Sequence, residues 1–301
     1  MRRFLPYFQL CRLPAVFSAI ADICCGFALT HLHPPTLQPY PIFALLVLAS
    51  CSLYLAGMIL NDVFDRQIDA QERPRRPIPS GRVSLQSAIR LAVILLIVGN
   101  IAAVCAGFTS SCVAVILTAC ILGYDGGLKN TVLGPVVMGS CRFFNILLGA
   151  SAVGGFPELF AAPQLPVAVG LGIYITGVTI FSRQEAATSS RLMLTFGAGV
   201  INLGLAILMG FILNFPTPIS SKYLTLAGFL AIVLTIDRRV LGSLSQPSAG
   251  RVQATVKTML MSLVSLNAIL IFHATGRPEI ATGVLALLLP AMYLGRWMSI
   301  T

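Results

Sequence analysis

The sequence predicts an all-α, polytopic transmembrane helical bundle of about nine to ten spans. Of its 301 residues, 56% are hydrophobic and only 10% are charged. Soluble globular chains carry about 25% charged residues, so this chain has too few polar groups for a surface that faces water. Apolar runs close to the roughly 20 residues that cross a bilayer recur along its whole length. Because these runs are continuous and not alternating, helices satisfy the backbone in the lipid bilayer better than a barrel does.

Ten apolar runs are expected to form these spans. The fourth run is short, and the last two either cross the bilayer or form a re-entrant or interfacial hairpin, so nine spans are also possible. The runs cover residues 13–32, 41–60, 84–106, 109–124, 132–153, 165–182, 191–213, 222–236, 257–274 and 278–296.

Basic residues alternate between the connections of these runs. The connections "HLHPPTLQPYP" and "GGFPELFAAPQLP" hold no Lys or Arg, whereas the segment 61–82 is rich in Arg. Under the positive-inside rule, the N-terminus and the segment 61–82 are expected to face the cytoplasm. The net charge of +10 therefore reflects topology, and we expect no nucleic-acid partner. No linker divides the chain, so residues 1–301 are expected to form one domain.

Scarce acidic residues gather in the segment 61–82, "NDVFDRQIDAQERPRRPIPSGR". If residues 61–72 form one helix, four carboxylates lie on one face, with Asn61 at its edge; they are Asp62, Asp65, Asp69 and Glu72. Like charges at this spacing repel, and the bilayer makes the ionised forms costlier, so a cation must compensate. Mg²⁺ suits the site, because it takes one or two carboxylates and leaves other positions for water and phosphate.

Arginines follow the carboxylates on a proline-stiffened loop. They are Arg73, Arg75, Arg76 and Arg82. Guanidinium groups match phosphate oxygens in a two-pronged geometry. Carboxylates for a metal beside arginines for phosphate predict a diphosphate site at the mouth of the membrane. The alternative is a solvated loop whose charges pair with each other.

Further polar residues follow in the segment 124–151. Tyr124, Asp125 and Lys129 are expected in a loop, and Arg142 and Asn145 on one face of the next span. Polar residues inside a span are functional-site candidates. The alternative is that Lys129 only reaches out of the bilayer and Asn145 only joins two helices.

Asp22 is a further polar residue, inside the first predicted span. Arg12 precedes it by ten residues, on nearly the same helix face. Asp22 is therefore expected either to pair with Arg12 or to line a cavity.

The pattern N-D-x-x-D-x-x-x-D followed by R-P-x-R-P-I-P-S-G resembles the first aspartate-rich motif of the UbiA-type intramembrane prenyltransferases. The resemblance extends from Arg12 to about Arg191. It implies a bundle of about nine helices around a central cavity, with a diphosphate site capped by cytoplasmic loops. It further implies transfer of an isoprenyl group from an allylic isoprenyl diphosphate to a hydrophobic acceptor, aromatic or lipid-like, with Mg²⁺ as cofactor.

The resemblance also implies roles for individual residues. Asn61, Asp62, Asp65 and Asp69 would hold Mg²⁺ and diphosphate, with the three aspartates as catalytic residues. Arg73 and Arg76 would hold phosphate or close the loop. Lys129 and Arg142 would bind diphosphate, and Asn145 would line the cavity.

The chain departs from the family in the connection "FSRQEAATSSR", residues 181–191. There the family has a second aspartate-rich motif, whereas Glu185 is the only carboxylate here. Arg183 beside it is expected to supply positive charge in place of a metal, so both residues are assigned to substrate binding. This departure resembles a divergent, EboC-like branch.

Two other functions compete with prenyl transfer. The weakened second motif favours a non-catalytic binder or transporter of isoprenoid diphosphates. A CDP-alcohol phosphotransferase is disfavoured, because "DGGLKN" lacks the Ala-Arg and the trailing aspartates of that motif.

Overall fold

The computed structural model describes residues 5–31, 39–183 and 190–296, and this part of the chain is helical with no strands. Each of the ten apolar runs coincides with helical structure, which confirms the predicted fold class. The α-helices are α1 (Leu5–Leu10), α2 (Leu13–Thr30), α3 (Pro39–Phe64), α4 (Arg66–Glu72), α5 (Leu85–Ala106), α6 (Phe108–Asp125), α7 (Gly134–Ala150), α8 (Phe156–Leu159), α9 (Gln164–Ser182), α10 (Arg191–Asn214), α11 (Ile219–Ser245), α12 (Ala249–Thr275), α13 (Pro278–Leu285) and α14 (Leu288–Leu294).

Eight helices in the described residues are long and apolar enough to cross a membrane. They are α2, α3, α5, α6, α7, α9, α10 and α12, with α7 extended by the 3₁₀ turn that follows it. Helix α11 is as long as these spans, with 27 residues, but it is more polar. The tenth run is broken between α13 and α14, which makes it a short helical pair. The protein is therefore an integral membrane protein.

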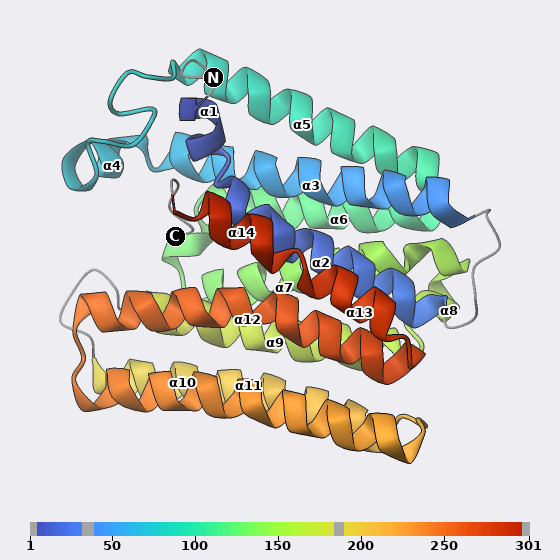
Figure 1. The fold of residues 1–301 in the computed structure, drawn as a ribbon. Coiled ribbons are helices and arrows are strands. Elements are labelled where there is room, and N and C mark those ends of the chain that lie inside the picture. Colours follow the sequence, from blue (N-terminus) through green and yellow to red (C-terminus); the bar gives the residue numbers. More distant parts are fainter. Residues whose placement is uncertain (1–4, 32–38, 184–189, 297–301) are drawn as a thin grey trace.

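The long helices lie side by side along one direction, and α2 runs through the middle of the bundle (Figure 1). Helix α2 packs against α3, α7, α12 and α14. Helix α4 and the connection between α11 and α12 lie at the same end of the bundle (Figure 1). We call this the motif end, because it carries the acidic segment.

Two glycines let α2 and α7 approach closely. A Cβ atom at Gly26 would lie 2.1 Å from the carbonyl oxygen of Ile146, and one at Gly149 would lie 2.6 Å from that of Ile23. Small residues at a crossing allow such backbone contact between membrane helices. This contact brings the polar residues of α2 and α7 within hydrogen-bonding distance of each other.

The predicted continuous helix over residues 61–72 is wrong, because α3 ends at Phe64 and α4 begins at Arg66. Between them, Asp65 has φ −82° and ψ 1°, outside the regular helical region. The break interrupts the regular helix, and the four carboxylates do not share one environment. Asp62 and Asp69 are buried, whereas Glu72 is exposed.

Candidate functional site

Two buried carboxylates at the motif end share one guanidinium. Asp62 and Asp69 are each only 4% exposed. Arg76 Nη1 lies 3.1 Å from Asp62 Oδ1 and 2.6 Å from Asp69 Oδ2. Arg12 Nη2 lies 3.1 Å from the same Asp62 oxygen. Loss of one partner would leave a buried charge uncompensated, so these contacts hold the Arg76 loop against the ends of α2 and α3.

The third motif carboxylate faces a different cation. Lys129 Nζ lies 2.5 Å from Asp65 Oδ1, across 64 residues of sequence. Lys129 belongs to the loop that joins α6 to α7, and Arg183 at the end of α9 holds this loop by donating to the carbonyl oxygens of Lys129 and Thr131. Arg183, which was expected to bind substrate, therefore lies near the site, but it contacts the backbone of this loop.

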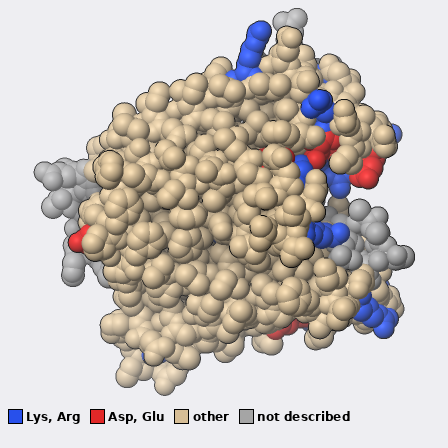
Figure 2. Space-filling view, turned by 180° about the vertical axis from the view of Figure 1, so that it is seen from behind, with Lys and Arg blue, Asp and Glu red and all other residues tan. Residues whose placement is uncertain are grey.

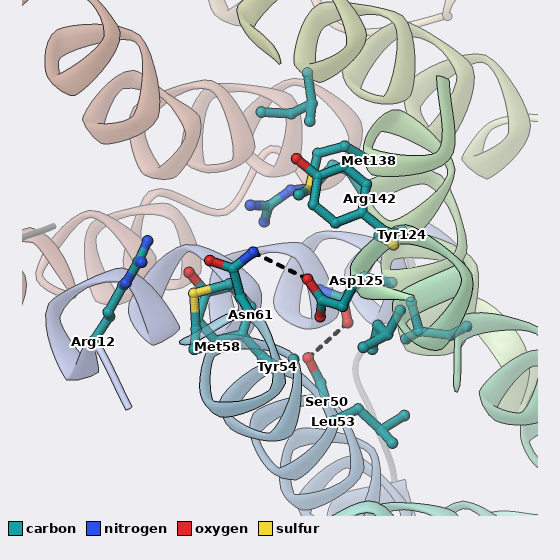
Figure 3. Close-up of a pocket in the computed structure, with 16 residues that line it drawn as sticks. Arg12, Ser50, Leu53, Tyr54, Met58, Asn61, Tyr124, Asp125, Met138 and Arg142 are labelled. Atoms are coloured by element: carbon teal, nitrogen blue, oxygen red, sulfur yellow. Dashed lines mark hydrogen bonds between the residues drawn. The ribbon is translucent and has the colours of Figure 1, made fainter. Parts of the chain in front are cut away.

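A cavity of about 220 Å³ extends from the motif end into the bundle. The mouth of this cavity, at the motif end, is lined by charged and polar residues: Arg12, Asn61, Tyr124 and Asp125 (Figure 3). Asn61 Nδ2 donates to Asp125 Oδ1 at 3.1 Å, and Asp125 is only 4% exposed. The prediction that Tyr124 and Asp125 lie in a loop is wrong, because they form the last turn of α6.

The middle of the cavity is apolar. Its wall there is formed by Leu53, Met58, Leu117, Ile121, Met138 and Ile175. These side chains come from α3, α6, α7 and α9. The cavity therefore joins a charged mouth to a wall that suits a hydrocarbon chain.

The cavity ends in a second polar group, formed by Ser50, Arg142 and Asn145. Ser50 Oγ donates to Asn145 Oδ1 at 2.7 Å (Figure 3). Arg142 and Asn145 both donate to Asp22, which is completely buried. Of the two roles expected for Asp22, pairing with Arg12 is wrong, because Arg12 contacts Asp62 and Asp22 contacts Arg142. The cavity lining includes its partners Arg142 and Asn145 and not Asp22 itself.

The structure separates the other predicted site residues. Arg73 is exposed at the end of α4. Arg82 donates to Gln9 Oε1 at 2.8 Å and so ties the loop to α1. Glu185 lies outside the described residues.

Sequence reasoning named Asp125 among the polar residues of the segment 124–151, but it gave neither Asp125 nor Ser50 a role in the site. Asp125 had a weak signal, because it is an acidic residue at the end of an apolar run. Ser50 had none, because a serine inside a helix can bond to a carbonyl oxygen of its own helix. Only the packing of α7 beside α3 gives Ser50 its partner Asn145.

The carboxylate oxygens of the motif fit a Mg²⁺ ion bound by one or two of them. Asp62, Asp65 and Asp69 each use one oxygen to contact a cationic side chain, and the second oxygen of each accepts no hydrogen bond from a described residue. Within the same described ranges, no three His, Cys, Asp or Glu side chains are grouped to hold a metal ion by themselves. Mg²⁺ would therefore need phosphate and water to complete its shell.

The mouth gathers both signs of charge at one end of the molecule. Figure 2 shows most of the visible Lys and Arg side chains at that end, with a group of acidic side chains among them. Along with the cavity, this arrangement allows an anionic group to bind at the mouth while an apolar group lies inside.

Curated relatives share sequence with this chain. It is 34% identical over 148 residues to the digeranylgeranylglyceryl phosphate synthase of Methanosarcina barkeri, covering 47% of this chain and 51% of the relative. It is 26% identical over 160 residues to the enzyme of the same name from Sulfolobus acidocaldarius, covering 53% and 57%. The chain thus spans about half the length of the curated relatives it matches.

Solved structures show the same fold. A UbiA homologue from Archaeoglobus fulgidus bound to GPP and Mg²⁺ superposes with a TM-score of 0.68 at 13% identity, covering 91% of this chain and 99% of that one. A UbiA homologue from Aeropyrum pernix K1 gives 0.66 at 16% identity, covering 91% and 97%. A sequence model of the UbiA prenyltransferase family matches residues 19–245. The chain therefore belongs to the UbiA prenyltransferase family.

Proposed function

We propose that this protein transfers an isoprenyl group, within the membrane, from an allylic diphosphate to a hydrophobic acceptor and releases pyrophosphate. The observation that carries the proposal is the cavity whose mouth holds paired carboxylates and cations and whose wall is apolar. The relatives named above are synthases, and a solved neighbour binds GPP and Mg²⁺, which supports an isoprenyl diphosphate as donor.

The mouth provides the chemistry for the diphosphate. Arg12, Arg76 and Lys129 donate to carboxylates here, and a bound diphosphate would accept from the same donors. Mg²⁺, held by one or two of the motif aspartates Asp62, Asp65 and Asp69, would neutralise the negative charge that grows on the leaving group. The cationic side chains add to this stabilisation and orient the diphosphate.

The apolar wall provides the second requirement. An allylic cation reacts with water, so the isoprenyl chain must ionise in a site that excludes water. Leu53, Met58 and Ile121 lie between the mouth and the polar group around Arg142, where they line the space open to the chain. The acceptor, aromatic or lipid-like, would place its nucleophilic carbon or oxygen at this level.

The proposal also covers the membrane orientation and the extent of the domain. We place the N-terminus and the motif end in the cytoplasm, because the basic connections lie at that end. We also treat residues 1–301 as one domain.

The test is pyrophosphate release from geranyl, farnesyl and geranylgeranyl diphosphates by the protein in lipid, with and without Mg²⁺. Release that needs Mg²⁺ and disappears in Asp65→Asn supports the transferase. Candidate acceptors such as phenols and a lipid extract are included in parallel reactions. Tight diphosphate binding without release in every reaction would favour the binder or transporter.

A further inference from the structure

A second group of basic residues lies away from the cavity, in a groove formed by α11, α12 and α14. The groove consists of two adjoining hollows of about 540 and 560 Å³, which share Arg239 and Ala254. We call it the basic groove. Its cationic residues are Arg238, Arg239, Arg251, Lys257 and Arg296.

The turn between α11 and α12 brings these cations together. Arg239 lies near the end of α11 and Arg251 near the start of α12, and the two helices are antiparallel neighbours (Figure 1). Ser243 and Thr255 hydrogen-bond at 2.9 Å between the two helices, and both are buried. The convergence is therefore built into the helix packing and does not depend on a loose loop.

These cations differ from those at the cavity mouth, because no described carboxylate neutralises them. Arg12, Arg76 and Lys129 each form an ion pair. None of the five groove cations forms one with a described residue, and neither hollow is lined by an Asp or Glu among the described residues. All five are exposed. The groove therefore presents positive charge that an external anion can neutralise.

The groove becomes apolar away from the motif end. On α12, Lys257 lies closer to that end than Met261. Arg296, in the turn that follows α14, lies closer to it than Met292 and Leu288 of that helix. The groove thus has a cation toward the motif end on both sides and apolar side chains farther from that end. A purely soluble anion would use the first part of the groove but not the second.

We propose that the basic groove binds an anionic phospholipid, with its phosphate on the arginines and an acyl chain along Met261, Leu288 and Met292. Guanidinium groups match phosphate oxygens, and basic pockets between membrane helices bind such headgroups. This site is independent of the proposed transferase reaction.

The test counts the phospholipid that stays with the purified protein. Wild-type protein is reconstituted with equal amounts of phosphatidylglycerol and phosphatidylcholine, extracted in mild detergent, and analysed by mass spectrometry. The groove variant is Arg239→Gln/Arg251→Gln. The matched control is Arg90→Gln/Arg191→Gln, which removes two exposed arginines outside the groove and so lowers the net charge equally.

The wild type and the control are expected to retain phosphatidylglycerol in preference to phosphatidylcholine. In the groove variant, the ratio of retained phosphatidylglycerol to phosphatidylcholine should fall at least about fivefold, since one basic residue near an anionic surface contributes about that factor. A melting temperature equal to that of the wild type shows that the variant is folded. Equal loss in both variants, or loss in neither, would overturn the proposal.

A competition experiment separates lipid from soluble phosphate. Labelled phosphatidylglycerol bound to the protein is challenged with glycerol 3-phosphate and with unlabelled phosphatidylglycerol. Displacement by the lipid at far lower concentration supports the assignment, because only the lipid reaches the apolar part of the groove. Equal potency of the two competitors would assign the groove to a soluble phosphate and refute the lipid assignment.

Discussion

Arg142 on α7 donates to the carboxylate of Asp22 on α2, 120 residues earlier in the chain. Asn145 and Asn267 donate to the same carboxylate at 3.0 and 2.8 Å. Asp22 is completely buried, so this cluster joins α2, α7 and α12 inside the bundle. It also fixes the arginine at the inner end of the cavity.

Replacing Asp22 alone should destabilise the protein strongly. Asp22→Leu leaves Arg142 without its counter-charge, and breaking a buried pair on one side costs about 3–5 kcal/mol. The double variant Asp22→Leu/Arg142→Met removes both charges and should recover most of that loss. The measurement is the free energy of unfolding in mixed micelles. A double variant no more stable than Asp22→Leu would contradict a direct pairing.

Arg76 should be needed for pyrophosphate release, because it contacts both buried carboxylates of the motif and lies where a diphosphate would bind. Arg76→Gln is expected to lower kcat by about 10²-fold, the loss typical of one electrostatic donor in a reaction centre. Arg75→Gln is the control, because Arg75 is exposed on the same loop. Similar losses in the two variants would mean that only the net charge of the loop matters.

Asp125 should act by holding Asn61 at the mouth of the cavity. Asp125→Asn keeps a side chain that accepts the hydrogen bond from Asn61, whereas Asp125→Leu removes it. We expect Asp125→Leu to raise KM for the diphosphate about tenfold and Asp125→Asn to raise it far less, since a lost hydrogen bond costs about 1 kcal/mol or more. Equal effects on KM would instead indicate that the negative charge of Asp125 is what matters.

Gly26 should be essential for the contact between α2 and α7. A Cβ there would lie 2.1 Å from one backbone atom and 2.8 Å from another, so Gly26→Ala must push the helices apart. Overpacking costs about 1–3 kcal/mol and more where backbone cannot yield. Gly199→Ala on α10 meets no atom within 4 Å and serves as the control.

Thermal unfolding of the two glycine variants in detergent decides this prediction. Gly199→Ala should melt at or slightly above the wild-type temperature, because alanine favours helix over glycine by up to about 1 kcal/mol. Gly26→Ala should melt clearly lower. Equal melting temperatures for both would show that the crossing of α2 and α7 tolerates a methyl group.

The spans and the family motif were predictable from the sequence, since both are local. A run of apolar residues long enough to cross a bilayer forms a helix for reasons contained in the run itself, because the backbone must bond internally. The spacing of Asp62, Asp65 and Asp69 with the following arginines likewise lies within one short segment. The break at Asp65 was missed, because periodicity assumes a helix that continues.

Only the tertiary structure decided which cation faces which carboxylate. Asp65 meets Lys129 across 64 residues, and Asp22 meets Arg142 across 120. The charge pattern allows many such pairs at similar electrostatic energy, so the helix packing selects among them. The close approach at Gly26 and Gly149 places α7 beside α2. Because of this backbone contact, Asp22 pairs with Arg142, and Arg12 pairs with Asp62.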